Sequence, residues 1–200
     1  MERTFWEAVA WRRSHYKLSS RAQVSDKRVE EMLESALLYT PSPFNVQSAR
    51  MVLLIGDQHR ELWDIVENTL RGIVTADRFA ATQTKIHDSF RNGRGTVLFY
   101  EDKVAIEQLK QRFPTYADAI DGFALQSSAM YQYVVWVGLE DMGYGASLQH
   151  YNPLIDDTVM RRWLIPPSWR LIAQMPFGTS LETPAPRVQT STAHSRLLVF

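Results

Sequence analysis

The chain has 200 residues, 45% of them hydrophobic, which suits a single globular domain with a sizeable core. Its 22 basic and 22 acidic residues balance to a formal net charge of zero, so nucleic acid and anionic membranes are not expected partners. It has no cysteine, no signal-peptide pattern and no apolar stretch near the roughly 20 residues that span a bilayer. We therefore expect a cytoplasmic protein without disulfides.

The first half of the chain predicts three helices and a strand. Residues 4–13 are expected to form a short helix with Phe5, Ala8 and Val9 facing inward. Residues 25–39 place apolar side chains at helical spacing, with Ser25 as the N-cap. Two prolines then end the helix, and the apolar run 51–55 predicts a buried strand followed by a third helix.

In the second half, residues 75–95 are polar and contain Asn-Gly-Arg-Gly, which predicts a loop before a strand at 96–100. A helix is expected from Glu101 to Phe113, and the longest helix from 117 to 142. Small side chains on the longest helix indicate a close helix crossing, either in the core or at a dimer interface; they are Ala124, Ser127, Ser128 and Ala129. A short helix at 156–164 and a strand at 169–175 complete an α+β domain spanning residues 1–200.

The C-terminal segment 179–200 is predicted to be an extended arm that ends in a strand. Residues 179–194 are too polar for a core, yet four apolar residues follow Arg196 at the chain end. A terminal strand of this kind is an aggregation hazard unless it pairs with a sheet edge, and the arm reaches about 50 Å. We therefore expect the strand to cross to a second subunit. The alternative is a strand folded back onto its own sheet.

Two segments carry polar groups suited to a ligand. Residues 12–16 read Arg-Arg-Ser-His-Tyr, and guanidinium forks with a hydroxyl suit a phosphate; the alternative is a solvated arginine pair at a helix end. The proline turn holds Ser42, Asn45, Gln47 and Ser48, which can present donors and acceptors to one flat, polar-edged ligand. Alternatively, these groups satisfy one another.

Four segments in this order and spacing, at 12–16, 40–50, 140–153 and 173–178, resemble the nitroreductase family of FMN-dependent oxidoreductases. The likeness is nearest to the small branch that includes the fatty-acid-repression-mutant-like proteins, and it runs from about Phe5 to Phe200. It implies a nitroreductase-like fold, with a central, mostly antiparallel sheet flanked by helices. It also implies a homodimer with FMN at the subunit interface and the C-terminal strand exchanged between subunits.

The resemblance also implies roles for individual residues. Arg12, Arg13 and Ser14 would bind the flavin phosphate and ribityl chain, whereas Ser42, Asn45 and Gln47 would contact the flavin held mainly by the other subunit. A backbone N–H near Gln149 or His150 would reach flavin N5. The remaining candidates are Lys85, as a cation near N1 and O2 or an ordinary exposed lysine, and Arg196, as a substitute phosphate ligand.

Several positions depart from the family pattern. Pro43 stands where a second serine is commoner, and its lack of an N–H removes one backbone donor. His150-Tyr151 replaces an acidic residue followed by glycine, and the His150 imidazole is either a pocket wall or surface group or a proton donor. Phe177 and Thr179 occupy positions where some relatives place basic phosphate ligands.

The function implied is that of a homodimeric FMN oxidoreductase. Hydride would pass from NAD(P)H through flavin N5 to a nitroaromatic, a quinone or a similar electron-poor acceptor, in ping-pong fashion. Two alternatives are a flavin-binding regulatory or stress-response protein with incidental turnover, and a structural dimer with a decayed flavin site. The intact Arg12-Arg13-Ser14 and Asn45 argue against the second alternative. No metal site is expected, since the five histidines are scattered.

Overall fold

A computed structural model describes residues 4–192 and 195–200. Its helices are α1 (Phe5–Trp11), α2 (Asp26–Tyr39), α3 (Asp57–Arg71), α4 (Ala76–Ile86), α5 (Lys103–Arg112), α6 (Ala117–Asp141) and α7 (Asp156–Trp163), with short turns η1 (Pro43–Asn45), η2 (His87–Arg91) and η3 (Pro114–Tyr116). Its strands are β1 (Leu18–Ser19), β2 (Ala49–Ile55), β3 (Gly95–Asp102), β4 (Gly145–Ala146) and β5 (Trp169–Ser180).

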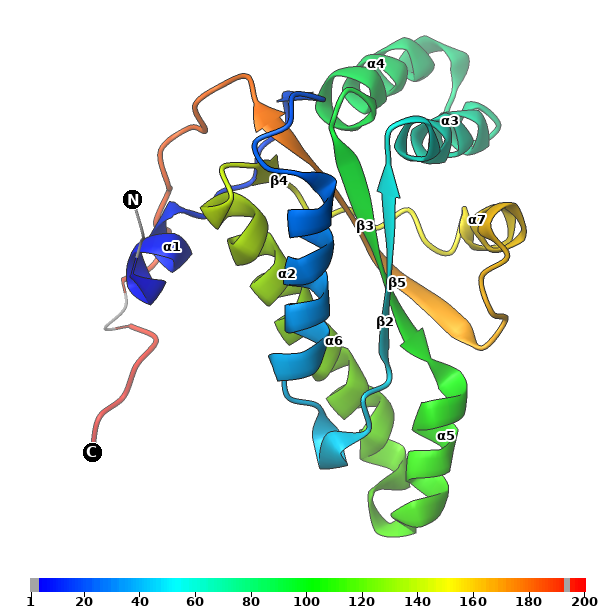
Figure 1. Cartoon of the computed structure of the whole chain (residues 1–200), viewed down its shortest axis with the longest axis vertical. Coiled ribbons are helices and arrows are strands. Elements are labelled where there is room, and N and C mark those ends of the chain that lie inside the picture. Colours follow the sequence, from blue (N-terminus) through cyan, green and yellow to red (C-terminus); the bar gives the residue numbers. More distant parts are fainter. Residues whose placement is uncertain (1–3, 193–194) are drawn as a thin grey trace.

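The strands form one antiparallel sheet with helices on both faces (Figure 1). Its order is β1-β5-β3-β2, and β4 pairs with β5. Along the central strand β3, Val97 and Phe99 belong to the core under α2 and α6, whereas Leu98 and Tyr100 belong to the core under α3 and α7. The alternation follows from the two-residue period of a strand buried on both faces. The predicted α+β fold and antiparallel sheet are confirmed.

Helix α6 and its neighbour α2 form the layer that supports the candidate site. Ser25 caps α2, as predicted, because its Oγ accepts the Arg28 N–H at 3.2 Å. Small residues allow the two helices to approach: Ser127 and Ser128 of α6 are buried, and a Cβ added to Gly138 would lie 2.9 Å from the Met32 sulfur. Of the small residues predicted at a helix crossing, Ala124, Ser127 and Ser128 are buried within the subunit, whereas Ala129 is exposed.

Two predictions about local structure are wrong. Phe5 does not face inward; it is 67% exposed, since α1 buries only Ala8. Residues 75–95 are not a loop, because they contain α4 and the single π-helical turn η2. The loop prediction failed because several of the polar side chains of α4 and η2 face a neighbouring helix rather than solvent.

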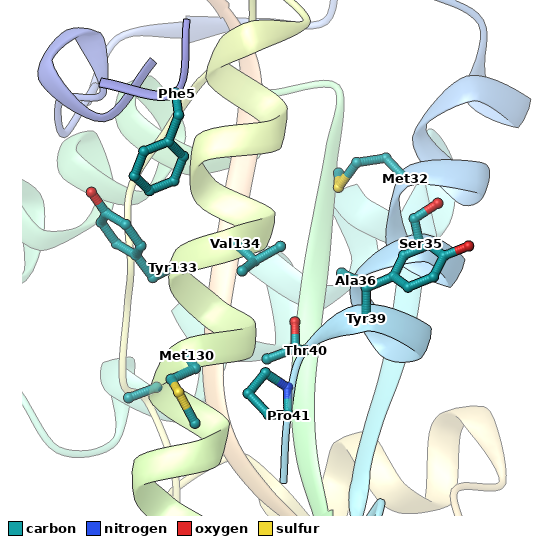
Figure 2. A pocket seen from close by; sticks show the side chains of 11 residues that line it. Phe5, Met32, Ser35, Ala36, Tyr39, Thr40, Pro41, Met130, Tyr133 and Val134 are labelled. Atoms are coloured by element: carbon teal, nitrogen blue, oxygen red, sulfur yellow. The ribbon is translucent and has the colours of Figure 1, made fainter. Parts of the chain in front are cut away.

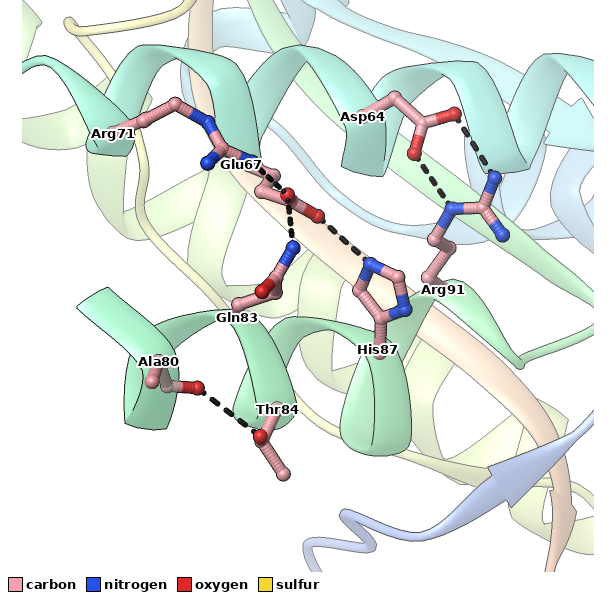
Figure 3. A network of polar contacts seen from close by, with 8 residues as sticks. All are labelled: Asp64, Glu67, Arg71, Ala80, Gln83, Thr84, His87 and Arg91. Carbon is pink, nitrogen blue, oxygen red and sulfur yellow. Dashed lines mark hydrogen bonds and ion pairs between the residues drawn. The ribbon is translucent and has the colours of Figure 1, made fainter.

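The polar contacts between α3 and α4 converge on Glu67, which is buried (Figure 3). Its carboxylate accepts from Arg71 Nη2 and Gln83 Nε2, each at 2.7 Å, and contacts His87 Nε2 at 2.8 Å. Arg91 donates two hydrogen bonds to Asp64 of α3, at 2.6 and 3.0 Å. A polar segment therefore becomes a helix because its polar groups have partners across the helix pair.

The C-terminal residues 195–200 form no strand within this chain. Leu198 and Val199 are 78% and 85% exposed, and the sheet of the described residues ends at β1 and β2. The expected strand at 196–200 is thus wrong for the single subunit, because no sheet edge of its own lies beside it. The alternative of a strand folded back onto its own sheet is wrong for the same reason. Exchange with a second subunit stays a prediction.

Within residues 4–192 and 195–200, no helix has the length and apolar content required to cross a membrane.

Candidate functional site

The phosphate-binding candidates follow directly after α1. Arg12 is the C-cap of this helix, and its guanidinium lies 4.4 Å from the centroid of the Trp136 ring on α6. Ser14 forms a parallel bridge with Ala146 of β4. Arg12 Nε and Trp136 Nε1 are buried, and neither has a hydrogen-bond partner among the residues that the structure describes. Buried donors of this kind are rare in folded proteins and point to an absent acceptor.

The C-terminal arm lies across this segment. Arg13 donates to the Ala185 carbonyl, and Arg187 Nη2 donates to the carbonyls of Ala10 and Arg12 at 2.8 and 2.6 Å. A cavity of about 530 Å³ lies between the arm and residues 12–16; it is lined by Arg12, Arg13, Ser14, Tyr16, Glu182, Thr183, Pro184 and Ala185. The guanidinium groups and the Ser14 hydroxyl therefore meet at one cavity, as a phosphate site requires.

The proline turn is built around left-handed backbone conformations. Phe44, Asn45 and Gln47 have φ values of 49°, 55° and 49°, and non-glycine residues rarely adopt such values. Phe44 is fixed by stacking on Phe113 with ring centroids 4.3 Å apart. Strain of about 1–3 kcal/mol per residue persists where surrounding contacts impose it, and it clusters at functional sites.

The polar groups of the turn partly satisfy one another, as the alternative reading of the sequence expected. Ser42 Oγ accepts the Gln47 N–H at 3.0 Å, and the Gln47 amide donates to Asn45 Oδ1 at 3.2 Å. Asn45 and Gln47 are exposed. The side-chain nitrogen of Asn45 stays available to a ligand. A further lone pair on the side-chain oxygens of Asn45 and Gln47 stays available as well.

A single chain does not bring the turn and the segment 12–14 together. The turn is held on α6 near Ser127, whose hydroxyl donates to the Pro41 carbonyl at 3.1 Å. The other segment is held near the end of α6, where His15 contacts Glu140. Ser127 and Glu140 lie about 20 Å apart along the helix axis. If both segments contact one flavin, they belong to different subunits.

Of the two backbone N–H groups predicted to reach flavin N5, those of Gln149 and His150, only one is available in the segment after α6. The Gln149 N–H donates to the Gln174 carbonyl at 2.7 Å, so that donor is already engaged in the sheet. The His150 N–H stays the candidate, and the His150 side chain is exposed. Tyr151 turns inward and packs edge-on against Trp63, with centroids 5.8 Å apart.

The two remaining candidates lie apart from residues 12–14. Lys85 is exposed on α4 and forms no ion pair with the residues described. Arg196 lines a cavity of about 480 Å³ formed within the arm by Gln189, Thr190, Ser191 and Thr192. In one subunit, therefore, the structure gathers Arg12, Arg13 and Ser14 at one cavity and leaves the other candidates separate.

Sequence reasoning assigned no role to three residues that lie next to the segment 12–14. Trp136 packs under Arg12, Arg187 holds the arm, and His15 is buried behind Ser14. Trp136 and Arg187 are distant in the chain, so no local pattern marks them. His15 lies within the predicted segment 12–16, but no role was predicted for it.

An apolar groove of about 680 Å³ lies between α1, α2 and α6 (Figure 2). Phe5 and Tyr133 lie on one side of it, and Met32 and Tyr39 on the other. Nearby aromatic side chains are also exposed, with Trp6 at 75% and Trp11 at 62%. Apolar surface of this extent usually marks an interaction site.

An antiparallel sheet packed between helices, with a cavity lined by two arginines and a serine, defines an α+β protein with a polar candidate site. Residues 9–179 match the model of the nitroreductase family, and the chain belongs to that family.

Relatives cover nearly the whole chain. "Putative nitroreductase HBN1" and "nitroreductase FRM2", both from Saccharomyces cerevisiae, are 32% and 30% identical over 183 residues, which is 90% of this chain and 90% of each relative. Among solved structures, the nitroreductase CinD from Lactococcus lactis in complex with chloramphenicol is 34% identical with a TM-score of 0.87, covering 98% of this chain and 100% of CinD. The likeness to FRM2 confirms the predicted branch.

A nitroreductase from Desulfitobacterium hafniense with bound FMN shares the fold at 14% identity, with a TM-score of 0.73 and full coverage of both chains. FMN is therefore a cofactor found in this fold family. The residues of the present chain fit such a cofactor, since Arg12, Arg13, Ser14 and the buried Arg12 Nε offer several donors at one cavity.

Proposed function

We propose that this protein is a homodimeric FMN-dependent oxidoreductase that takes reducing equivalents from NAD(P)H and passes them to electron-poor acceptors. The observation that carries the proposal is the cavity of Arg12, Arg13 and Ser14, beside a buried arginine nitrogen that has no partner among the described residues. FMN, when bound, supplies the redox chemistry by accepting and donating hydride at N5.

The chain's own residues bind and orient the cofactor. Arg12 and Arg13 hold the phosphate through charge-assisted hydrogen bonds, and Ser14 adds a hydroxyl donor. The His150 N–H is the donor directed to the ring, while Ser42, Asn45 and Gln47 of a second subunit border it. Lys85 and Arg196 are further cationic candidates toward the ring and the phosphate.

A dimer accounts for three features of the single chain. The groove of Figure 2 leaves apolar side chains of α1, α2 and α6 in solvent, and the turn and the segment 12–14 lie about 20 Å apart along α6. A second subunit packed on this face covers the groove and supplies the missing turn to each flavin. The exposed residues 197–200 then find a partner surface.

Nitroaromatic compounds are the acceptors best supported. CinD, 34% identical to this chain, has been captured with chloramphenicol and with 4-nitrophenol. Both ligands carry a nitro group on an aromatic ring, so this chain is proposed to accept compounds of that class.

The test of this function begins with purified protein. It should be yellow, it should bleach when NADH or NADPH is added without acceptor, and it should regain colour when 4-nitrophenol or a quinone is added. Steady-state kinetics should give parallel double-reciprocal lines, because donor and acceptor use one pocket in turn. Intersecting lines would contradict the shared pocket. Bound flavin that neither nucleotide reduces would favour the regulatory alternative.

A further inference from the structure

Arg50, the second residue of β2, ties the proline turn to the end of the central strand β3. Its Nη1 donates to the Gln47 carbonyl at 2.7 Å and to the Ala49 carbonyl at 3.0 Å, while its Nη2 donates to Asp102 Oδ2 at 2.9 Å. The guanidinium also lies over the Trp169 ring, 5.7 Å from its centroid. Neither Arg50 nor Asp102 takes part in the flavin contacts proposed above.

Asp102 is itself fixed by the elements around it. It is the last residue of β3 and the N-cap of α5, where its Oδ1 accepts the Val104 N–H at 3.1 Å. Its own N–H donates to the Ser48 carbonyl at 2.9 Å, and its side chain is only 14% exposed. The carboxylate that anchors Arg50 therefore belongs to the sheet and not to the turn.

The Gln47 carbonyl belongs to a strained part of the chain. Gln47 and Asn45 have φ values of 49° and 55°, and such backbone persists where surrounding contacts impose it. The hydrogen bond from Arg50 is one of these contacts. A second is the hydrogen bond from the Gln47 N–H to Ser42 Oγ, at 3.0 Å.

The Gln47 side chain in turn fixes the orientation of the Asn45 amide. Gln47 Nε2 donates to Asn45 Oδ1 at 3.2 Å. An amide has one oxygen that accepts and one NH2 group that donates. Because the Asn45 oxygen is engaged by Gln47, the orientation of the amide leaves its NH2 group for a ligand. The contacts thus run from Asp102 through Arg50 and Gln47 to Asn45.

We propose that Arg50 is a positioning residue for the flavin ring. By holding the Gln47 carbonyl next to Asp102, it keeps the Asn45 NH2 group directed at the carbonyl oxygens of the ring bound in the second subunit. The inference rests on the proposed function, in which the turn 42–47 borders that ring. Since FMN and riboflavin share the ring, Arg50 affects both, whereas Arg12 acts on the phosphate and affects FMN.

The test is a pair of double-mutant cycles, measured by titration of full-length apo-protein with FMN and with riboflavin. Arg50→Ala should lower the affinity for both flavins about tenfold, because the turn loses a charged donor. In an Asn45→Ala background, the same substitution should cost less than about twofold, since the group that Arg50 orients is gone. In an Arg12→Ala background, it should again cost about tenfold in FMN affinity, because the phosphate contacts are independent of the turn.

Two further variants keep the inference testable if Arg50→Ala does not fold. Arg50→Lys can still pair with Asp102, but it lacks the planar fork that joins two acceptors, so it should keep most of the loss. Asp102→Asn can still cap α5 but offers Arg50 no anion. It should therefore weaken binding of both flavins, and this loss should also disappear in the Asn45→Ala background.

Arg162→Ala is the matched control. It breaks another arginine–carboxylate pair, with Glu61, between α7 and α3 and away from the turn. This variant should bind both flavins as the wild type does.

The outcomes separate this inference from the function on which it rests. If Arg50→Ala costs the same affinity with and without Asn45, Arg50 has only a structural role. A loss for FMN alone, or an Asn45→Ala variant that binds both flavins as the wild type does, would also overturn the inference. If the wild type binds neither flavin, the proposed function itself is wrong.

Discussion

Arg12 and Arg13 differ in what surrounds them, although they are adjacent. Arg12 packs on Trp136 with a buried Nε, whereas Arg13 already donates to the Ala185 carbonyl of the arm. Arg12 therefore has a preorganised guanidinium with unused donors, and Arg13 must give up or share a contact to bind a phosphate. The sequence alone treats the two as equivalent.

Replacement of either arginine by alanine should weaken FMN binding. The larger loss, which we expect for Arg12→Ala, should be about 1.5–3 kcal/mol, the scale of a hydrogen bond to a charged group. Isothermal titration with FMN measures this loss, and riboflavin serves as the control because it lacks the phosphate. If both variants bind FMN as the wild type does, the pair is only a charged helix end.

His59 is a buried histidine with a structural role. Its Nδ1 lies 2.8 Å from Thr96 Oγ1, which also accepts the Trp63 indole N–H at 3.0 Å. Burial lowers the pKa of His59 from 6.5 to about 4. Between these two values the unfolded chain binds a proton that the folded protein excludes, so stability decreases as the pH falls through this range.

The free energy of unfolding should therefore drop by roughly 3 kcal/mol from this residue as the pH falls from about 6.5 to about 4. Urea denaturation of the wild type and of His59→Asn at several pH values in this range measures the drop. The variant should be less stable at neutral pH and should lose less stability on acidification. Parallel curves for the two proteins would mean that other groups cause the whole pH dependence.

At the scale of elements, α4 is held on α3 by polar contacts rather than by a broad apolar face. Ile86 is the one buried residue of α4, while Gln83 and His87 converge on Glu67. Helix α4 also carries Lys85, so the stability of this helix determines where that lysine can lie.

Glu67→Ala should loosen α4 by about 1–3 kcal/mol, because Gln83 and His87 lose their acceptor. Hydrogen exchange of the α4 amides reports this change directly. Glu61→Ala, which breaks an exposed ion pair with Arg162, is the matched control and should cost under about 1 kcal/mol. Unchanged exchange in α4 of Glu67→Ala would show that the network does not hold the helix.

For the whole molecule, the apolar groove and the exposed chain end both require a partner surface. Met130 and Tyr133 line the groove and are 42% and 40% exposed, and Phe200 is fully exposed. Met130 and Tyr133 lie on α6, outside the core cluster that Val135 and Leu139 of the same helix form against the sheet. The predicted flavin site would thus be complete only in the dimer.

Deletion of residues 195–200, or substitution Tyr133→Glu in the groove, should shift sedimentation toward monomer or aggregate and release FMN. The charge cannot be buried at an apolar interface, and without the partner each flavin loses the turn 42–47. Ile73→Glu at the end of α3, outside the groove, should remain dimeric and yellow. A dimeric, yellow truncated protein would show that the chain end does not hold the subunits together.

The sequence by itself determined the elements whose signals are local. Ser25 marks the start of α2 and the two prolines mark its end, because capping and the missing proline N–H act within a few residues. The strand at 96–100 and the long helix at 117–142 were predicted from local patterns, and four short motifs together indicated the family, whose resemblance implied a sheet flanked by helices.

Only the tertiary structure decided the rest. Helix α4 appeared as a loop because its polar groups find partners on α3, which lies on the far side of a turn. The Gln149 N–H donates to the Gln174 carbonyl, and the His15 side chain contacts Glu140 and Ser180. These outcomes depend on contacts between residues distant in the chain. A sequence contains the donors and acceptors, but only folding determines which of them meet.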